Sequence, residues 1–267
     1  MLSPRHLTNA LISSAAVLIV AANYVPGHEQ NGPVFNAVAS AVTAKPARAA
    51  EPATDGVASK VASALQSFSS VVGRLSHPKA LDDAFGAYFA YRAEHPNDVK
   101  KPYLYFVDYG LSSTTPRGYV FDMDAHRIVE GPFMVAHGRG SSASRYGVPT
   151  RFSNGSGSAM TSLGLYLTKA LYTFTGHTAG KTYSSVGLRL DGVSTGFNDK
   201  AFARGVVAHG APYVTPKGAG RSEGCPAMEP ARAQELLPKL ANGAMVFLFA
   251  PNDQWMSRDP WVSAAMQ

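Results

Sequence analysis

The segment RSEGCPAMEP, residues 221–230, contains the only cysteine in a chain of 267 residues. Cys225 lies in a polar loop between a glycine and a proline, and His209 lies near the end of the apolar run GVVAHG that precedes this loop. Cysteine attacks as the thiolate, which requires a lowered pKa or a nearby base. A histidine at a strand end can be that base if the intervening chain folds back. This pair therefore indicates nucleophilic acyl-transfer chemistry.

Glycines at 218, 220 and 224 give the intervening loop the backbone freedom that such a fold-back requires. Gly224 permits the backbone of a substrate to approach the thiol closely. Backbone N–H groups around Cys225 can then face the oxyanion of a tetrahedral intermediate. A lone cysteine is more often a small buried hydrophobe, but the polar, glycine-flanked position of Cys225 favours a reactive thiol.

Several segments in order carry a resemblance to a known family. HG at 209–210 followed by SEGCPA at 222–227 resembles the signature of the YkuD-type L,D-transpeptidases, and more narrowly that of the murein L,D-transpeptidase catalytic-domain subfamily. SLGLYLT at 162–168 and LRLDGVSTGFND at 188–199 resemble the same subfamily. The resemblance therefore extends over residues 103–250 and leaves the N-terminal part uncovered.

The resemblance implies a β-sandwich enzyme that cross-links peptidoglycan without a cofactor. Cys225 would attack the amide between the third residue of a donor tetrapeptide stem and its terminal D-Ala, releasing D-Ala and forming a thioester. An amine of an acceptor stem would resolve it. By the same resemblance, His209 is the general base or ion-pair partner, and the Gly210 carbonyl orients its imidazole. Gly224 and Cys225 would supply oxyanion-hole amides, and Ser222 would order the loop.

Glu223 departs from the family pattern, because the wider family usually has histidine at this position. An ionised carboxylate cannot donate the hydrogen bond that a histidine could donate there. We interpret Glu223 as a solvated loop acid. If it lies close to Cys225, its charge opposes thiolate formation.

Other residues are weaker candidates. His137 shares the VAHG context of His209 and is an alternative base, although a structural role at a strand end is favoured. Arg189 and Asn198 are candidates for binding stem carboxylates, but an Arg189–Asp191 pair that fixes a turn explains the same residues. Arg221 is a candidate for steering an anionic stem peptide, and a solvated loop charge is an equal alternative.

Several other classes of function lack support. The eight histidines are scattered without HxH or HxxxH spacing, and one cysteine cannot anchor a zinc site, so we expect no metal. No glycine-rich phosphate-binding motif is present, which argues against nucleotide binding. The formal net charge of +6 comes without a Lys/Arg run with interleaved aromatics, so we expect no nucleic-acid binding.

The elements that must position these residues are mainly strands. Short β-branched and aromatic runs, separated by Gly, Ser, Asn and Asp, predict a β-rich catalytic domain over residues 98–250, with a few peripheral helices. An amphipathic helix is predicted within 76–97, and a second helix from Pro230 to the Asn–Gly pair at 242–243. The runs are YLYFVDYG, GYVFDMD, GPFMVAHG, SLGLYLT, SVGLRLDG, ARGVVAHG and AMVFLFA.

The two ends of the chain are predicted to be non-globular. Residues 1–22 resemble a signal peptide, because a basic start precedes an apolar segment that is short for a bilayer span. Cleavage could follow residue 22 or occur as late as residue 49; an uncleaved membrane anchor is the alternative. Export would place the protein in the periplasm or cell envelope. Residues 23–75 are predicted to be a linker or pro-region with a weak helix at 56–72, and residues 251–267 a tail.

Two rival functions remain open from sequence. An L,D-carboxypeptidase would form the same acyl-enzyme and pass it to water. A non-catalytic wall-binding module is favoured only by Glu223, as a sign of lost reactivity. Sortase-like and papain-like schemes fit the spacing and order of His209 and Cys225 less well. The acceptor, the third stem residue and the oligomeric state are not determined by the sequence.

Overall fold

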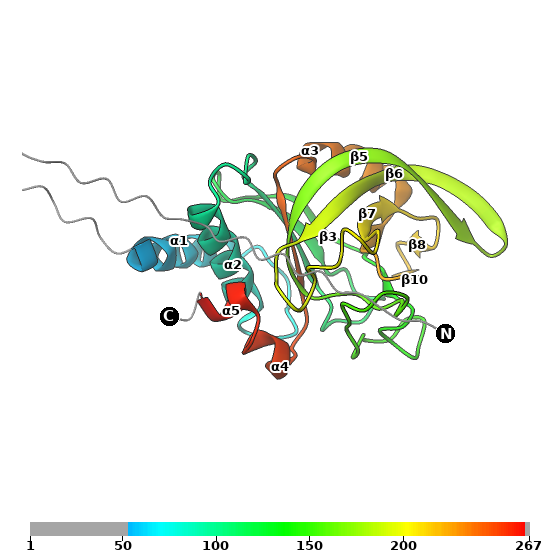
Figure 1. The fold of residues 1–267 in the computed structure, drawn as a ribbon, viewed down its shortest axis with the longest axis horizontal. Coiled ribbons are helices and arrows are strands. Elements are labelled where there is room, and N and C mark those ends of the chain that lie inside the picture. The colour runs from blue at the N-terminus through cyan, green and yellow to red at the C-terminus, as the bar shows by residue number, and fades with distance from the viewer. Residues whose placement is uncertain (1–52, 265–267) are drawn as a thin grey trace, which may run out of the picture. The chain divides into compact units, whose positions relative to one another are not determined.

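The fold of residues 53–264, which are the residues described in this computed structural model, is built on one mixed sheet of eight strands (Figure 1). The strand order is β11-β7-β6-β5-β12-β1-β2-β3, in which β1 pairs with β12 and β7 with β11 in parallel. The mainly β fold class is therefore confirmed. The strands are β1 (Tyr103–Asp108), β2 (Gly118–Asp122), β3 (Arg127–Phe133), β5 (Gly164–Thr178), β6 (Lys181–Gly192), β7 (Val207–Gly210), β11 (Ala227–Met228) and β12 (Met245–Phe249).

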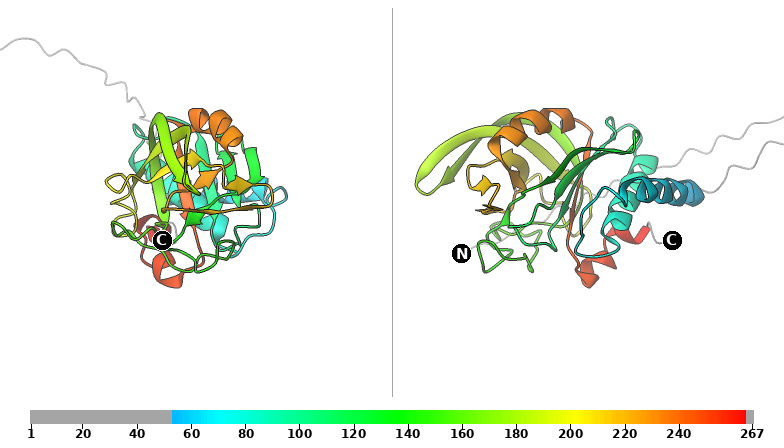
Figure 2. Two further views of the ribbon diagram at one scale, coloured as in Figure 1. Left: turned by 90° about the vertical axis from the view of Figure 1, so that its right-hand side faces the viewer. Right: turned by 180° about the vertical axis from the view of Figure 1, so that it is seen from behind.

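Two small ribbons and five helices complete the described part of the chain. The ribbons pair β4 (His137–Gly138) with β10 (Arg221–Ser222), and β8 (Val214–Thr215) with β9 (Gly218–Ala219). Figure 2 shows α1 and α2 at one end of the sheet and the curved β5–β6 hairpin at the other. The helices are α1 (Ala53–Phe68), α2 (Ala80–Glu94), α3 (Pro230–Leu240), α4 (Asp253–Met256) and α5 (Pro260–Ala264).

The core lies on the central strands, which are apolar on both faces. All residues of β2 and β12 are buried, as are all but the first of β1. Strands with such continuous apolar runs are covered on both sides. The predicted helix within 76–97 is present as α2, but it is buried around most of its circumference because α1 and α5 pack against it. The helix predicted from Pro230 is present as α3, with Pro230 in its first turn.

The N-terminal boundary of the folded unit lies earlier than the sequence predicts. The weak helix expected at 56–72 within the predicted linker (residues 23–75) is present as α1, but Val61, Ala64 and Phe68 of this helix are buried in the main core. The Phe68 ring centroid lies 4.7 Å from that of Phe121 in β2. Because burial of one aromatic side chain contributes about 1.5–3 kcal/mol, α1 is part of the folded domain and not a spacer.

The C-terminal segment is also folded, where the sequence predicts a tail. Trp255 is buried against Phe249 of β12, and its indole N–H donates to the Asp259 carboxylate at 2.8 Å. Val262 of α5 is buried as well. The leader and cleavage sites expected within residues 1–49 lie outside the described residues. Between residues 53 and 264, no helix is both long enough and apolar enough to cross a membrane.

The β5–β6 hairpin is longer than the two runs that predict it. It continues through residues 169–184 to a turn at Ala179 and Gly180, whose φ angles are 49° and 75°. Two consecutive residues with positive φ form a turn whose twist matches that of paired strands. The distal half of the hairpin is largely exposed, and its outer end reaches beyond the helices and core (Figure 1). This extension places Phe174 and Tyr183 beside the candidate site.

Candidate active site

The chain between His209 and Cys225 folds back, as the sequence predicts. His209 lies in β7, and Cys225 lies in the loop between β10 and β11. Strands β7 and β11 are parallel neighbours with Ala227 opposite His209, and the His209 N–H donates to the Pro226 carbonyl at 3.3 Å. The loop of residues 223–226, which carries the candidate nucleophile Cys225 and is called the nucleophile loop below, is therefore fixed to the strand that carries the candidate base.

Both side chains line one cavity of about 690 Å³, which is within the usual size range of small-molecule sites. One wall is the β5–β6 hairpin, and the other combines residues 156–159 with residues 203–206. Cys225 is half-buried and His209 is nearly fully buried. The cavity thus gives an incoming chain access to the thiol beside an imidazole that is shielded from water.

The imidazole of His209 is neutral and defined in its tautomer. Its Nδ1 lies 3.0 Å from the Gly210 carbonyl oxygen; because a carbonyl only accepts, Nδ1 carries the hydrogen. Nε2 then keeps its lone pair, and no described residue hydrogen-bonds to it. Burial lowers the pKa of His209 to about 4, against the opposing effect of the Gly210 contact. Phe174 stacks on the ring with centroids 4.0 Å apart. His209 therefore has a lone pair on Nε2 that can accept a proton, and it is not an imidazolium at rest.

The thiol of Cys225 is also neutral at rest. Burial raises its pKa above the usual range, and the Glu223 carboxylate adds to this as the smallest contribution. The backbone of Val207 and the Arg204 guanidinium act in the opposite direction and lower the pKa. A thiol in this state needs a base at the moment of attack. The sequence leaves two ways to form the attacking thiolate: a lowered thiol pKa or a nearby base. The raised pKa of Cys225 agrees with a nearby base and not with a lowered thiol pKa.

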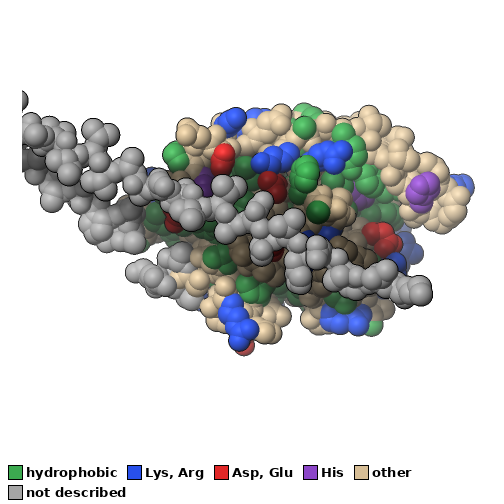
Figure 3. Space-filling view, viewed as in Figure 1, with side chains coloured by type: hydrophobic (Ala, Val, Ile, Leu, Met, Phe, Trp, Pro, Cys, Tyr) green, Lys and Arg blue, Asp and Glu red, His purple; other side chains and the backbone are tan. Residues whose placement is uncertain are grey.

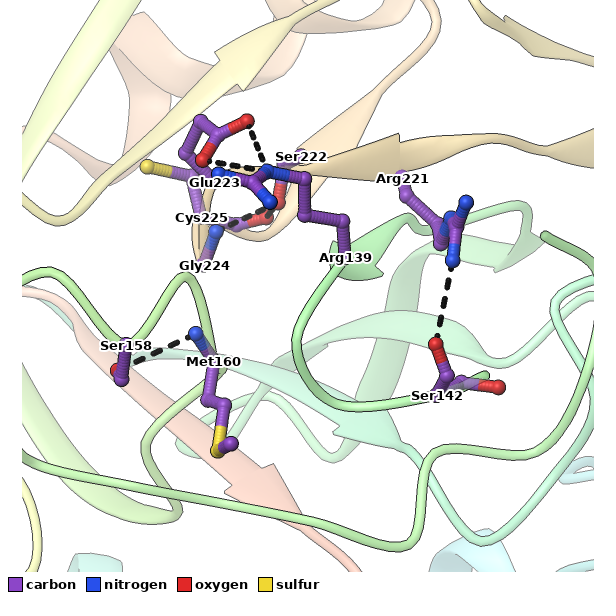
Figure 4. A network of polar contacts seen from close by, with 9 residues as sticks. All are labelled: Arg139, Ser142, Ser158, Met160, Arg221, Ser222, Glu223, Gly224 and Cys225. Atoms are coloured by element: carbon purple, nitrogen blue, oxygen red, sulfur yellow. Dashed lines mark hydrogen bonds and ion pairs between the residues drawn. The ribbon is translucent and has the colours of Figure 1, made fainter. Parts of the chain in front are cut away.

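The nucleophile loop is held by one hydroxyl (Figure 4). Ser222 Oγ donates to the Cys225 carbonyl at 2.7 Å and accepts from the Gly224 N–H at 3.1 Å. The Gly224 amide, which the family resemblance assigns to the oxyanion hole, is thus engaged within the loop. The Cys225 N–H has no acceptor in the part of the chain that the structure describes. Cys225 is therefore the better candidate for the oxyanion donor.

Gly224 occupies a position that only glycine fits. Its φ is +129°, and a Cβ there would lie 2.8 Å from the Met160 carbonyl oxygen. The segment around Met160 consequently packs directly against the nucleophile loop. Any larger residue would displace one of these two segments.

Glu223 lies at the exposed rim of the site. Both of its carboxylate oxygens accept from Arg139 Nε, at 2.7 and 2.9 Å. The two side chains are 71% and 61% exposed, so water and salt screen the pair and it adds little to stability. Glu223 is exposed, as interpreted from sequence, but it is paired and not simply solvated. Figure 3 shows basic and acidic side chains interspersed on the visible face.

The candidate substrate-binding residues are separated by the fold. Arg221 lines the cavity, and its guanidinium donates to the Ser142 carbonyl at 3.2 Å. Arg189 is exposed outside the cavity lining and lies 4.5 Å over the Tyr172 ring. The alternative Arg189–Asp191 pair is wrong, because Asp191 contacts Lys169 at 3.1 Å instead.

Asn198 has a structural position. It is fully buried, and its side-chain oxygen accepts from the Ser194 N–H at 2.9 Å. Its amide group donates to the Leu165 carbonyl, also at 2.9 Å. The side chain therefore fixes residues 194–198 to the start of β5, and it lies outside the lining of the cavity.

His137, the alternative base, does not line the cavity either. It is fully buried in β4, and its Nδ1 accepts from Arg117 Nη2 at 2.9 Å. Burial lowers the pKa of His137 to about 3, with smaller contributions from the positive charges of Arg117 and Arg221. The two VAHG segments thus differ in their surroundings: His209 lines the cavity, whereas His137 is enclosed in the protein.

Several lining residues were missed from sequence, among them Arg204, Phe174 and Tyr213. Arg204 lies only a few residues before His209, but nothing in its neighbourhood marks it as functional. Alternation of aromatic and polar residues in the distal hairpin was the one signal for Phe174. Among residues 53–264, no group of three or more His, Cys, Asp or Glu side chains could hold a metal ion.

Comparison with known proteins gives a match to one family model and matches to several solved structures. A family model described as an L,D-transpeptidase catalytic domain matches residues 74–249. No curated protein matches significantly. Among solved structures, the chain is 14% identical to an L,D-transpeptidase from Mycobacterium smegmatis, with a TM-score of 0.34, covering 56% of this chain and 59% of that one.

Two further structures are similar at the same level. L,D-transpeptidase 3 from Mycobacterium tuberculosis is 14% identical, with a TM-score of 0.35 and coverage of 55% of this chain and 61% of that one. An L,D-transpeptidase from Stackebrandtia nassauensis is 15% identical, with a TM-score of 0.34 and coverage of 79% and 97%. The chain spans about three fifths of the length of the two mycobacterial structures.

Proposed function

Because the chain belongs to the L,D-transpeptidase catalytic domain family, whose members act on peptidoglycan, we propose that it forms a thioester on Cys225 from a tetrapeptide stem and transfers the acyl group to an amine. The observation that carries the proposal is the shared cavity, which is lined both by a neutral imidazole with a free Nε2 and by the only thiol. Donor and acceptor stems are the proposed partners.

In the first half-reaction, Cys225 Sγ attacks the carbonyl carbon of the amide that precedes the terminal D-Ala. His209 Nε2 takes the thiol proton as the S–C bond forms, so no free thiolate has to persist in a buried site. The Cys225 N–H donates to the oxyanion. When the tetrahedral intermediate collapses, the C–N bond breaks, and the imidazolium returns its proton to the leaving amine of D-Ala.

In the second half-reaction, an acceptor amine attacks the thioester carbonyl. His209 Nε2 accepts a proton from the attacking nitrogen, the C–S bond breaks, and the proton passes to the departing sulfur. The products are a new amide and the free thiol. Water in place of the amine would give a free carboxylate, which is the L,D-carboxypeptidase outcome.

Substitution of Cys225 with alanine should abolish acylation and leave the fold intact, because the loop is held by the Ser222 hydroxyl and backbone groups and not by the sulfur. Intact-mass spectrometry after incubation with a carbapenem should show one adduct on the parent protein and none on Cys225→Ala. Circular dichroism checks the fold. Absence of any adduct on the folded parent protein would contradict the proposal.

A digest of muropeptides separates the two enzymatic outcomes. Transfer to an amine gives cross-links between third stem residues, whereas transfer to water gives tripeptide stems. Loss of both products in Cys225→Ala assigns them to the same thiol.

We also propose that the chain is exported to the periplasm or cell envelope. The proposal rests on the apolar segment at 10–22 and the small residues that follow it. N-terminal sequencing of the protein from fractionated cells should show a start after residue 22 or residue 49. Recovery of the protein with an intact N-terminus in the cytoplasmic fraction would contradict export.

A further inference from the structure

Arg204 binds one loop of the active-site wall with both of its terminal nitrogens. Nη1 donates to the Ser153 carbonyl at 2.9 Å and to Ser162 Oγ. Nη2 donates to the Met160 carbonyl at 3.0 Å and to Ser158 Oγ at 3.3 Å. Residues 153–162 contain no strand or helix, and these bonds from one guanidinium tie four positions of the loop together.

This loop is in direct contact with the nucleophile loop. A Cβ at Gly224 would lie 2.8 Å from the Met160 carbonyl oxygen and 3.7 Å from Arg204 Nη2. Figure 4 shows Ser158 and Met160 on one side of Gly224 and Cys225, and the Glu223 carboxylate on the other. The Arg204 guanidinium, which binds Ser158 and Met160, therefore lies next to Gly224 in the nucleophile loop.

Arg204 and Arg221 are the two arginines in the lining of the cavity, and of these only Arg204 lowers the pKa of the Cys225 thiol. His209 is neutral, as its burial requires. Arg139 is paired with Glu223 at the exposed rim. Arg204 lines the cavity without a carboxylate partner among the described residues, because its hydrogen bonds go to neutral oxygens. Its positive charge is therefore not cancelled by a neighbouring acid.

We propose that Arg204 is a positioning residue with two effects: it holds residues 153–162 against Gly224, and it supplies the positive charge that favours negative charge on Cys225 sulfur during attack. The second effect is consistent with the direction in which Arg204 moves the thiol pKa. The effect on acylation rests on the proposed function, whereas the effect on the thiol does not. A merely structural arginine would alter stability but leave the titration of the thiol unchanged.

The test compares Arg204→Met and Arg204→Lys with the parent. The rate of alkylation by iodoacetamide, a neutral reagent, is measured against pH for the single thiol. The parent midpoint should lie above the ordinary range of a thiol, because burial raises the pKa of Cys225. In Arg204→Met we expect the midpoint to rise by about one pH unit, which corresponds to about tenfold less thiolate at a fixed pH below the midpoint. Arg258→Met, at an exposed arginine far along the chain, should leave the midpoint unchanged.

Arg204→Lys separates the two effects. It keeps the charge but loses the planar fork that binds four oxygens, so its midpoint should stay near that of the parent while carbapenem acylation at pH 7 falls. An unchanged midpoint in folded Arg204→Met, or an equal shift in the lysine and methionine variants, would overturn the electrostatic part. Parental acylation in Arg204→Lys would overturn the positioning part.

Both variants are first checked by thermal melting. If Arg204→Met does not fold, Arg204→Lys still tests the electrostatic effect. The proposal predicts that its alkylation midpoint stays at the parental pH, and a shifted midpoint would contradict it. A parent protein that forms no carbapenem adduct would defeat the proposed function, but the alkylation midpoints would still report on Arg204.

Discussion

Replacement of His209 with glutamine should slow thioester formation by about 10²–10⁴-fold, which is the usual contribution of a general base. Glutamine can donate to the Gly210 carbonyl as the imidazole does, but it cannot take a proton from sulfur. The measurement is the rate of carbapenem adduct formation by intact mass. His177→Gln is the matched control, because His177 lines the same cavity but is exposed in the hairpin.

The pKa of His209 determines whether the rate of acylation rises or falls with pH. Burial lowers the pKa of His209 to about 4, so the imidazole is protonated and inactive below that pH and becomes a base above it. Acylation of the parent should therefore increase as pH rises through about 4, and His209→Gln should lack this increase. Alkylation of the variant above the thiol pKa should remain within a few-fold of the parent, since solvent then removes the proton. Acylation of His209→Gln at the parental rate would exclude His209 as the base.

The two residues that we propose carry the chemistry could be selected from the sequence because they are close together in it and chemically distinctive. Cys225 is unique, His209 ends a strand, and the intervening glycines allow the reversal. The parallel pairing of β7 and β11 then brings them to one cavity. What the sequence did not indicate was the protonation state, because both pKa shifts arise from burial by distant segments such as the hairpin residue Phe174.

The remaining misses have physical causes. Strands β4 and β10 have two residues each, too few for any periodic pattern. Residues 53–68 are rich in alanine and serine, so their helix looks marginal until Phe68 packs on Phe85 and Phe121. Arg204 acts through a loop with no regular pattern, and its partners are mostly carbonyls and hydroxyls that any sequence could supply.

The stability of the site depends on a second arginine, Arg117, which is fully buried. Its guanidinium donates to the Val135 carbonyl through Nε at 3.0 Å and Nη2 at 2.8 Å, and to the Leu111 carbonyl at 2.6 Å. It also donates to His137 Nδ1 and lies 4.8 Å over the Tyr109 ring. Burial lowers the pKa of Arg117 to about 10, which leaves it charged at neutral pH.

Arg117→Met should reduce the free energy of unfolding by about 2–4 kcal/mol. The buried Val135 carbonyl and His137 Nδ1 each lose a donor, at about 1–3 kcal/mol each, and the partly buried Leu111 carbonyl loses one at a smaller cost. Relief from burying a charge offsets part of this loss. Denaturant unfolding monitored by circular dichroism measures the change. Arg127→Met is the control: its partner Asp122 lies at 3.2 Å, but the arginine is 60% exposed, so the loss should be below about 1 kcal/mol.

Arg117→Lys distinguishes the charge from the hydrogen bonds. An ammonium group restores the positive charge but cannot reach the Val135 and Leu111 carbonyls and His137 at once in the geometry of a planar fork. If the hydrogen bonds dominate, the lysine variant should be destabilised about as much as the methionine variant. His137 of β4 is the strand partner of Arg221 in β10, which directly precedes the nucleophile loop. Loss of the Arg117 hydrogen bonds should therefore also slow acylation in the molecules that remain folded. A change in unfolding free energy below about 1 kcal/mol in Arg117→Met would mean that the freed acceptors find water or new donors, and that β4 does not depend on this arginine.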